Sequence, residues 1–287
     1  RRSHGLEMAK SPPIGLHSTI LQPKAQLNAR SNINSLDELD QNLKLLKCDF
    51  PLQTADKEFK GSKFGSFICY TFPTASFERR CLAIDFVNWS FFVDDLVDSK
   101  KYLRNPRKIK KELDKFLTIL DNKPQEITNE EWQLNFRNSV SLYFDACYLN
   151  ALNKCSQDLP KSVEEYLKIR RNSGGVLPVF DFIEPLLGIK ILCNNLDLKI
   201  FINHCIDHIC FINDLYSIKK ELTEGEVDNI VVVLQYANQY SLQEAIDYAV
   251  MLTNNRMTQI KEVFDNSSRF SLEMDDHNTI KYVNALI

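Results

Sequence analysis

Apolar residues recur at helical spacing through most of this chain, and that periodicity constrains the fold more than any other feature. Between residues 130 and 155 the apolar positions are Trp132, Phe136, Val140, Tyr143, Phe144 and Cys147. Only 8 Gly and 10 Pro interrupt the 287 residues. The run 230–234 also suits a strand, although a buried helix fits it at least as well. We therefore expect an all-α, single-domain bundle of about ten helices.

Capping and breaking residues set the expected boundaries. Residues 1–34 read as an N-terminal arm, partly linker or tag, and residues 35–287 as the domain. A helix over 162–187 should be interrupted at 172–175 and again near Pro178. The other expected helices are 36–47, one ending near Tyr70, one from Thr74 or Ser76 towards Asp94, one opening at Pro106, 130–155, 197–223, 229–236, 241–264 and one from 278.

Bulk properties exclude several classes of protein. A net charge of −3 and a pI near 6.0 give no electrostatic footprint for nucleic acid. No apolar run approaches the roughly 20 residues that span a bilayer. Eight cysteines lie mostly inside apolar helical runs, which indicates buried thiols in a reducing compartment. We expect a cytoplasmic protein without a membrane span.

Three carboxylates end one of the apolar runs. Asp94 and Asp98 are four residues apart and share a helix face, with Asp95 beside them. Such a cluster requires a neutralising cation, and oxygen ligands at this spacing suit Mg²⁺ together with substrate phosphates. The aromatic pair at 91–92 indicates an apolar cavity beside it. Alone, the cluster is equally consistent with a solvated helix end.

A second polar edge strengthens the magnesium interpretation. Asn213, Ser217 and Glu221 step by four, so an amide, a hydroxyl and a carboxylate line one helix face. These are oxygen donors that Mg²⁺ favours over softer ligands. The simpler alternative is an ordinary exposed stripe. Against it, the preceding residues 206–212 are largely apolar, so this helix is partly buried and its polar groups need partners.

Paired glycines interrupt the helical pattern between these two edges. Gly174 and Gly175 would each cost about 1 kcal/mol relative to Ala in a helix interior. They fit either a kink that lets helices pack closely or a break that turns backbone carbonyls towards a cavity. Arg170 and Arg171 directly precede the break and could bind phosphate oxygens.

With these motifs in order, residues 35–287 resemble class I terpene synthases (terpene cyclases) of the small, single-domain microbial, amoebal and coral type. Asp94, Asp95 and Asp98 match the D-D-x-x-D motif. The second metal motif matches at Asn213, Asp214, Ser217, Lys220 and Glu221. Asn229 falls where the family often carries a His-Asn pair, and Phe72-Pro73 is similar to its aromatic-Pro pair.

The resemblance implies a helical fold around a central apolar cavity, three Mg²⁺ ions (Mn²⁺ as an alternative) and a prenyl diphosphate substrate. The metal ligands would be Asp94, Asp95, Asp98, Asn213, Ser217 and Glu221. Arg171 would sense the diphosphate, Gly174 would be the linker, and the carbonyl of Gly175 would face the forming cation. Lys220 would contact diphosphate. Phe91 would steady the cation as an aromatic partner, with Phe67 and Trp89 as weaker candidates.

One part of the family pattern is absent. No Arg-Tyr pair follows the second motif, so a C-terminal lid segment is expected to be missing. Farnesyl or geranylgeranyl diphosphate is the expected substrate, and a sesquiterpene or diterpene the product. The alternatives are a trans-prenyltransferase, whose second motif would be another D-D-x-x-D, and a non-catalytic all-α interaction protein. A homodimer is left open.

Overall fold

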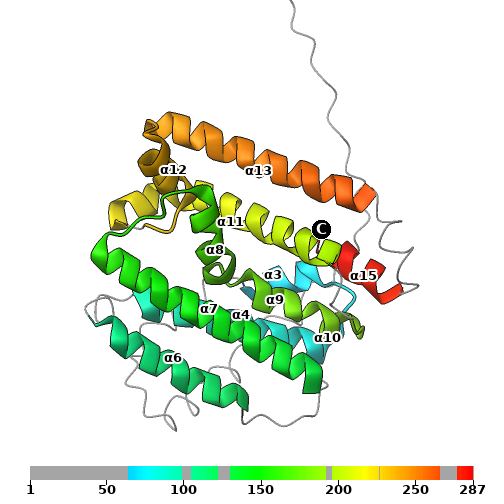
Figure 1. Cartoon of the computed structure of the whole chain (residues 1–287). Coiled ribbons are helices and arrows are strands. Elements are labelled where there is room, and N and C mark those ends of the chain that lie inside the picture. The colour runs from blue at the N-terminus through cyan, green and yellow to red at the C-terminus, as the bar shows by residue number, and fades with distance from the viewer. Residues whose placement is uncertain are drawn as a thin grey trace, which may run out of the picture.

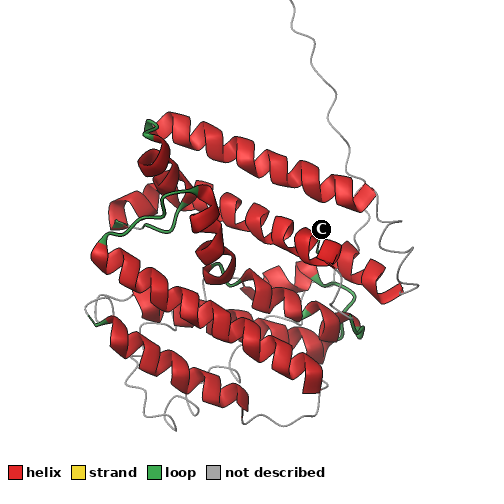
Figure 2. Cartoon of the chain, in the orientation of Figure 1, coloured by secondary structure: helices red, strands yellow, loops and turns green. Residues whose placement is uncertain are grey.

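The structure, a computed structural model, describes residues 64–98, 105–121, 130–191, 196–225, 227–265 and 277–286. Within its helices a few side chains are not described, among them those of Asp95 and Asp98. The described ranges consist of helices joined by turns and loops and contain no strand (Figures 1 and 2). The expected helix 36–47 and the domain boundary after residue 34 lie outside them.

The observed helices follow the expected order. Their bounds are α3 (Phe64–Thr71), α4 (Phe77–Asp98), α6 (Pro106–Asp121), α7 (Glu130–Ser156), α8 (Val163–Ser173), α9 (Val176–Asp181), α10 (Ile183–Leu187), α11 (Leu196–Glu224), α12 (Ile230–Asn238), α13 (Leu242–Asp265) and α15 (His277–Ala285). No described helix combines the length and the apolar composition needed to cross a membrane.

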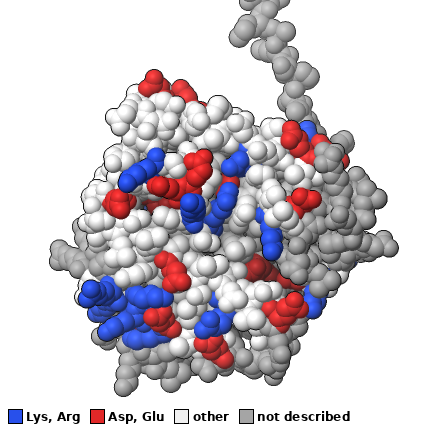
Figure 3. All heavy atoms as spheres, viewed as in Figure 1, with Lys and Arg blue, Asp and Glu red and all other residues white. Residues whose placement is uncertain are grey.

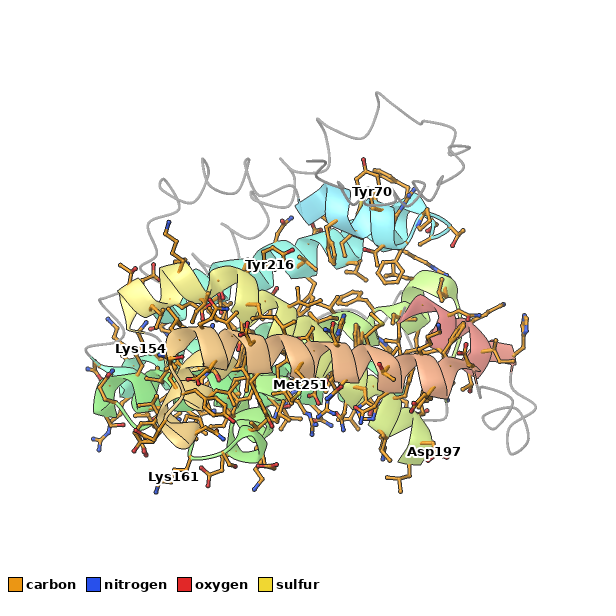
Figure 4. The ribbon with its side chains drawn as sticks, turned by 90° about the horizontal axis from the view of Figure 1, so that it is seen from above. Tyr70, Lys154, Lys161, Asp197, Tyr216 and Met251 are labelled. Atoms are coloured by element: carbon orange, nitrogen blue, oxygen red, sulfur yellow. The ribbon has the colours of Figure 1, made fainter. Side chains whose placement is uncertain are left out.

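Two long helices, α11 and α13, lie side by side in the bundle. α13 packs along α11, and Figure 4 shows the pair from above with α13 in front. α7 runs across the middle of Figure 1, with α6 on its outer side, and α8 packs against both α7 and α11. α8 therefore connects the part of the bundle that contains α6 and α7 with the part that contains α11 and α13.

Two apolar clusters hold these helices together. The larger one includes Phe116, Phe144, Phe201 and Ile183, all at most 1% exposed, and joins α4, α6, α7, α10 and α11. The smaller one joins α8, α11, α12 and α13 around Tyr166 and Phe211. Burial of apolar area at about 25 cal/mol per Å² is the main stabilising contribution of both clusters.

The ambiguous run 230–234 is a buried helix. Asn229 caps α12, because its side chain accepts a hydrogen bond from the amide of Val231. Ile230, Val231, Val233 and Leu234 are all 0% exposed within the smaller cluster. Because this helix is buried on most sides, its sequence lacks the polar residues that mark the exposed face of an amphipathic helix. The result is a short continuous apolar run, which resembles a buried strand.

The break after α8 occurs at the glycines, as expected, but Pro178 does not cause the second interruption. Pro178 lies in the first turn of α9, where its missing amide proton costs nothing. The second interruption is at Phe182, between α9 and α10. The expectation of a break near Pro178 was therefore wrong by about one turn.

On the face shown in Figure 3, positive and negative side chains are interspersed over the middle of the molecule. Blue atoms gather at the lower left, over the N-terminal half of α6, where Arg107, Lys108 and Lys111 are exposed.

Candidate functional site

A hollow of about 250 Å³ lies between α4, α7, α8, α11 and the segment that follows α11. We call it the polar hollow. Its lining residues are Asp94, Val97, Cys147, Asn150, Ala151, Lys154, Arg170, Ser173, Asn213, Ser217, Lys220, Glu221, Glu224, Val227 and Asp228. Figure 4 places Lys154 at the end of the molecule where α11 also ends. Because its lining is mostly polar and charged, the polar hollow suits a charged ligand better than a hydrocarbon.

The polar hollow brings the two predicted polar edges together. Asp94 lines it from the last part of α4, and Asn213, Ser217 and Glu221 line it from α11. Their sequence separation exceeds one hundred residues, so only the tertiary fold can bring them together. Asp95 and Asp98 belong to the same predicted set, but their side chains lie outside the description.

Local hydrogen bonds orient the α11 edge. The Ser217 hydroxyl donates to the carbonyl oxygen of Asn213 at 2.8 Å, one turn earlier. Glu221 accepts a hydrogen bond at Oε2 from the Asn229 amide at 2.7 Å. The edge therefore presents an amide, a hydroxyl and a carboxylate whose positions are fixed by the helix and by its neighbours.

Of the two adjacent arginines, Arg170 lines the polar hollow. Its Nη2 donates to Asn213 Oδ1 at 2.8 Å and to Asp214 Oδ1 at 2.6 Å. Its Nη1 lies 3.7 Å from Asp228 Oδ2. Its buried Nε has no hydrogen-bond partner within the described part of the chain. Arg170 is thus a largely buried cation whose terminal nitrogens are held by acceptors of α11 and by Asp228.

The sequence assigned the diphosphate-sensing role to Arg171, and the structure places Arg171 elsewhere. Its guanidinium forms a two-pronged pair with Asp207, with nitrogen–oxygen distances of 2.7 and 2.9 Å, and it does not line the polar hollow. Asp207 is 0% exposed and also accepts from Arg256 of α13 at 2.8 Å. In this structure Arg171 therefore ties α8 to α11 and α13.

Asp214 is buried beside the α11 edge, which consists of Asn213, Ser217 and Glu221. It is 0% exposed and accepts hydrogen bonds from the Tyr166 hydroxyl at 2.6 Å and from the backbone amide of Ile230 at 2.7 Å, besides the Arg170 guanidinium. Burial raises the pKa of Asp214 to about 6, while Arg170 and Tyr166 oppose the rise. The hydrogen-bond donors and the Arg170 counter-ion together stabilise this buried carboxylate and hold it in place.

The glycine break lies directly beside the polar hollow. A Cβ on Gly174 would sit 2.7 Å from the Cys210 sulfur, and Gly175 adopts the left-handed region with a φ of 65°. Both positions thus require glycine, the first for close packing of α8 on α11 and the second for its backbone conformation. Neither glycine lines the polar hollow, whereas the preceding Ser173 does.

Asn150, Lys154 and Asp228 are among the lining residues that sequence reasoning missed. Asp228 Oδ2 accepts hydrogen bonds from the Ser173 hydroxyl at 2.7 Å and from the Asn150 amide. Asn150 and Lys154 share one face of α7, a signal that the sequence did contain. Asp228 lies between helices, where no periodicity shows which way a side chain points.

The other predicted contacts differ in position. Lys220 lines the polar hollow and is 74% exposed there, with Glu224 at 3.8 Å. Phe67 and Phe91 are 53% and 47% exposed and do not line it. Trp89 packs against Phe116 and Phe144 in the larger apolar cluster. The predicted aromatic lining is thus not part of the polar hollow.

The polar hollow offers the oxygen donors that a hard divalent ion requires. Among the described side chains no three His, Cys, Asp or Glu residues converge. The oxygen donors that line the polar hollow are the carboxylates of Asp94, Glu221, Glu224 and Asp228, the amides of Asn150 and Asn213, and the hydroxyls of Ser173 and Ser217. Mg²⁺ binds with one or two carboxylates plus water and phosphate oxygens, so this set fits it.

Comparisons with known proteins show what this chain is similar to in sequence. Residues 122–259 match a family model described as terpene synthase family 2, C-terminal metal binding. The chain is 26% identical over 258 residues to germacrene A synthase of Nostoc punctiforme, covering 82% of this chain and 79% of that protein. It is 28% identical over 247 residues to a (+)-T-muurolol synthase of Roseiflexus castenholzii, covering 75% and 73%.

Solved structures give the same fold. A linalool/nerolidol synthase from Streptomyces clavuligerus superposes with a TM-score of 0.72 at 16% identity, over 92% of this chain and 94% of that one. An α-eudesmol synthase superposes with a TM-score of 0.70 at 16% identity, over 93% and 94%. The family match and the sequence similarities support a class I terpene synthase, and the solved structures show the same all-α fold.

Proposed function

We propose that the protein binds a linear prenyl diphosphate with Mg²⁺ at the polar hollow, ionises it and cyclises the resulting cation, releasing diphosphate. One observation carries the proposal. Asp94 of α4 and Asn213, Ser217 and Glu221 of α11 line the same hollow. Oxygen donors from both helices, together with the cationic Lys154, Arg170 and Lys220 in the same lining, suit a metal–diphosphate ligand.

The residues would divide the work by charge. Asp94, with Asp95 and Asp98, would hold Mg²⁺ on the α4 side, and Asn213, Ser217 and Glu221 on the α11 side; three ions are proposed, with Mn²⁺ as a substitute. Bound Mg²⁺ supplies Lewis-acid stabilisation of the negative charge that develops on the leaving diphosphate. The Lys220 ammonium would add to that stabilisation at the rim of the polar hollow.

Arg171 stays the arginine proposed to sense diphosphate, and Arg170 is a second candidate because it lines the polar hollow. In this structure each arginine is paired with a buried carboxylate, Arg170 with Asp214 and Arg171 with Asp207. The roles proposed for Gly174 as linker, for the Gly175 carbonyl, and for Phe91 and Phe67 towards the hydrocarbon stay predictions. Ionisation leaves a carbocation, so the hydrocarbon must lie where water is excluded.

We propose farnesyl diphosphate as the preferred substrate and a sesquiterpene as the product, with geranylgeranyl diphosphate and a diterpene second. The (+)-T-muurolol synthase is named as cyclising (2E,6E)-farnesyl diphosphate, and other relatives are named germacrene A and (+)-eremophilene synthases. Incubation with C10, C15 and C20 prenyl diphosphates and Mg²⁺, followed by gas chromatography–mass spectrometry, tests this order directly.

Site variants complete that experiment. Asp94→Ala, and Asn213→Ala combined with Ser217→Ala, should abolish product while helical circular dichroism is retained. Unchanged turnover in either variant would refute the assignment of the site. A longer prenyl diphosphate formed on adding isopentenyl diphosphate would instead indicate a prenyltransferase. The absence of any Mg²⁺-dependent diphosphate binding would favour an interaction protein.

We propose a cytoplasmic setting for the enzyme. The described cysteines 69, 81, 147, 155, 205 and 210 are free thiols, which supports a reducing, cytoplasmic compartment. A homodimer stays a prediction, and light scattering of the purified protein measures the molar mass that tests it.

A further inference from the structure

Asn229 is fully buried, and every polar atom of its side chain is used. Its Nδ2 donates to the backbone oxygen of Asp214 at 2.9 Å and to Glu221 Oε2 at 2.7 Å. Its Oδ1 accepts from the backbone amide of Val231 at 2.8 Å. Two donors and one acceptor are therefore satisfied in a single orientation, because a flipped amide would set its oxygen against two other acceptors.

The partner that matters for the site is Glu221. It is the carboxylate of the α11 edge, and it lines the polar hollow. With Oε2 held by an amide proton, the carboxylate cannot rotate freely, and Oε1 is the oxygen left to face a ligand in the polar hollow. A carboxylate that offers one oxygen matches the octahedral geometry that Mg²⁺ demands.

We infer that Asn229 is a positioning residue, which acts through Glu221 to fix how the α11 edge binds a divalent cation; this rests on the proposed function. Asn229 cannot itself reach a ligand, since it is 0% exposed and does not line the polar hollow. Its contribution is the orientation of Glu221, comparable to outer partners of metal ligands, whose loss typically lowers metal affinity about 10–100-fold.

A purely structural alternative exists, because Asn229 also caps α12. The two roles can be separated by side-chain chemistry. Asn229→Ser keeps an oxygen for the cap but cannot reach Glu221, and Asn229→Asp keeps the cap oxygen while removing both donors. Ser241→Ala provides the matched control, because Ser241 Oγ accepts the amide of Glu244 at the start of α13, away from the polar hollow.

The test is calorimetric titration of Mg²⁺ into the full chain in the presence of inorganic diphosphate, with thermal unfolding measured in parallel. Asn229→Ser and Asn229→Asp should weaken Mg²⁺ binding by about tenfold or more. Ser241→Ala should lower the unfolding temperature and leave Mg²⁺ affinity unchanged. Adding Asn229→Ser to Glu221→Ala should cause no further loss of affinity, because the partner through which Asn229 acts is already gone.

Two results would overturn the inference alone. One is wild-type Mg²⁺ affinity in both Asn229 variants, and the other is an additive loss in the double variant. If the wild-type chain shows no Mg²⁺-dependent diphosphate binding, the proposed function fails and the inference fails with it. The wild-type titration therefore distinguishes the two failures.

Discussion

At the residue scale, the adjacent arginines of α8 hold different carboxylates. Arg170 pairs with Asp214, which has no other charged donor among the described residues, whereas Asp207 has both Arg171 and Arg256. Both carboxylates are 0% exposed. A buried carboxylate that loses its counter-ion destabilises the fold strongly, so the two arginines should differ in the cost of their removal.

Arg170→Ala should therefore lower the free energy of unfolding by about 3–5 kcal/mol, because it leaves Asp214 uncompensated. Arg171→Ala should cost clearly less, because Arg256 still neutralises Asp207. Urea unfolding followed by circular dichroism measures both values. A larger loss for Arg171→Ala than for Arg170→Ala would contradict this account of the two ion pairs.

At the element scale, the break between α8 and α9 depends on two glycines for two different reasons. Gly174→Ala should cost about 1–3 kcal/mol of stability, because the new Cβ meets the Cys210 sulfur at 2.7 Å. Repeating the substitution in a Cys210→Ala background should recover part of that loss. A double-mutant cycle by urea unfolding measures the coupling, and strict additivity would mean that the sulfur is not the obstacle.

Gly175→Ala should behave differently from its neighbour. Its cost of about 1–2 kcal/mol arises from a φ of 65°, where an L side chain is strained. The same Cys210→Ala background should leave this cost unchanged. Rescue of Gly175→Ala by Cys210→Ala would show that contact with α11, and not backbone conformation, requires glycine there.

The same elements show how far the sequence determined the structure. Helical periodicity and capping residues located most described helices to within a few residues, and the fixed rise of a helix placed Asn213, Ser217 and Glu221 on one face. Periodicity could not decide which adjacent arginine lines the polar hollow, since each residue turns the helix by about 100° and the register of α8 depends on its packing. Asp228 lies between helices, where periodicity does not indicate which way a side chain points. The run 230–234 was decided by burial on α8, α11 and α13, which is a tertiary effect.

At the scale of the whole molecule, one buried carboxyl distant in sequence from the polar edges should make stability depend on pH. Burial raises the pKa of Asp181 to about 7, the Ser139 hydroxyl opposes the rise and Glu184 adds to it. In the unfolded chain the pKa is about 3.9. The folded state thus binds this proton more tightly, so its contribution to stability falls as pH rises from about 4 to about 7.

Asp181→Asn should remove this loss of stability with rising pH. Relative to wild type, the variant should gain roughly 2 kcal/mol in free energy of unfolding between pH 5 and pH 8, as measured by urea titrations at both values. Asp247→Asn, an exposed position on α13, serves as the control and should show no such trend. A difference between Asp181→Asn and wild type that does not change with pH would contradict this source of pH dependence.

The central claim is that Asp94 of α4 and the Asn213–Ser217–Glu221 edge of α11 bind the same metal–diphosphate ligand in the polar hollow. A crystal structure of the protein grown with Mn²⁺ and inorganic diphosphate, with anomalous scattering data, tests it most directly. Anomalous peaks are expected in contact with Asp94 and with Asn213, Ser217 and Glu221, bridged by diphosphate. Diphosphate-bound crystals whose manganese peaks lie away from these residues would contradict it.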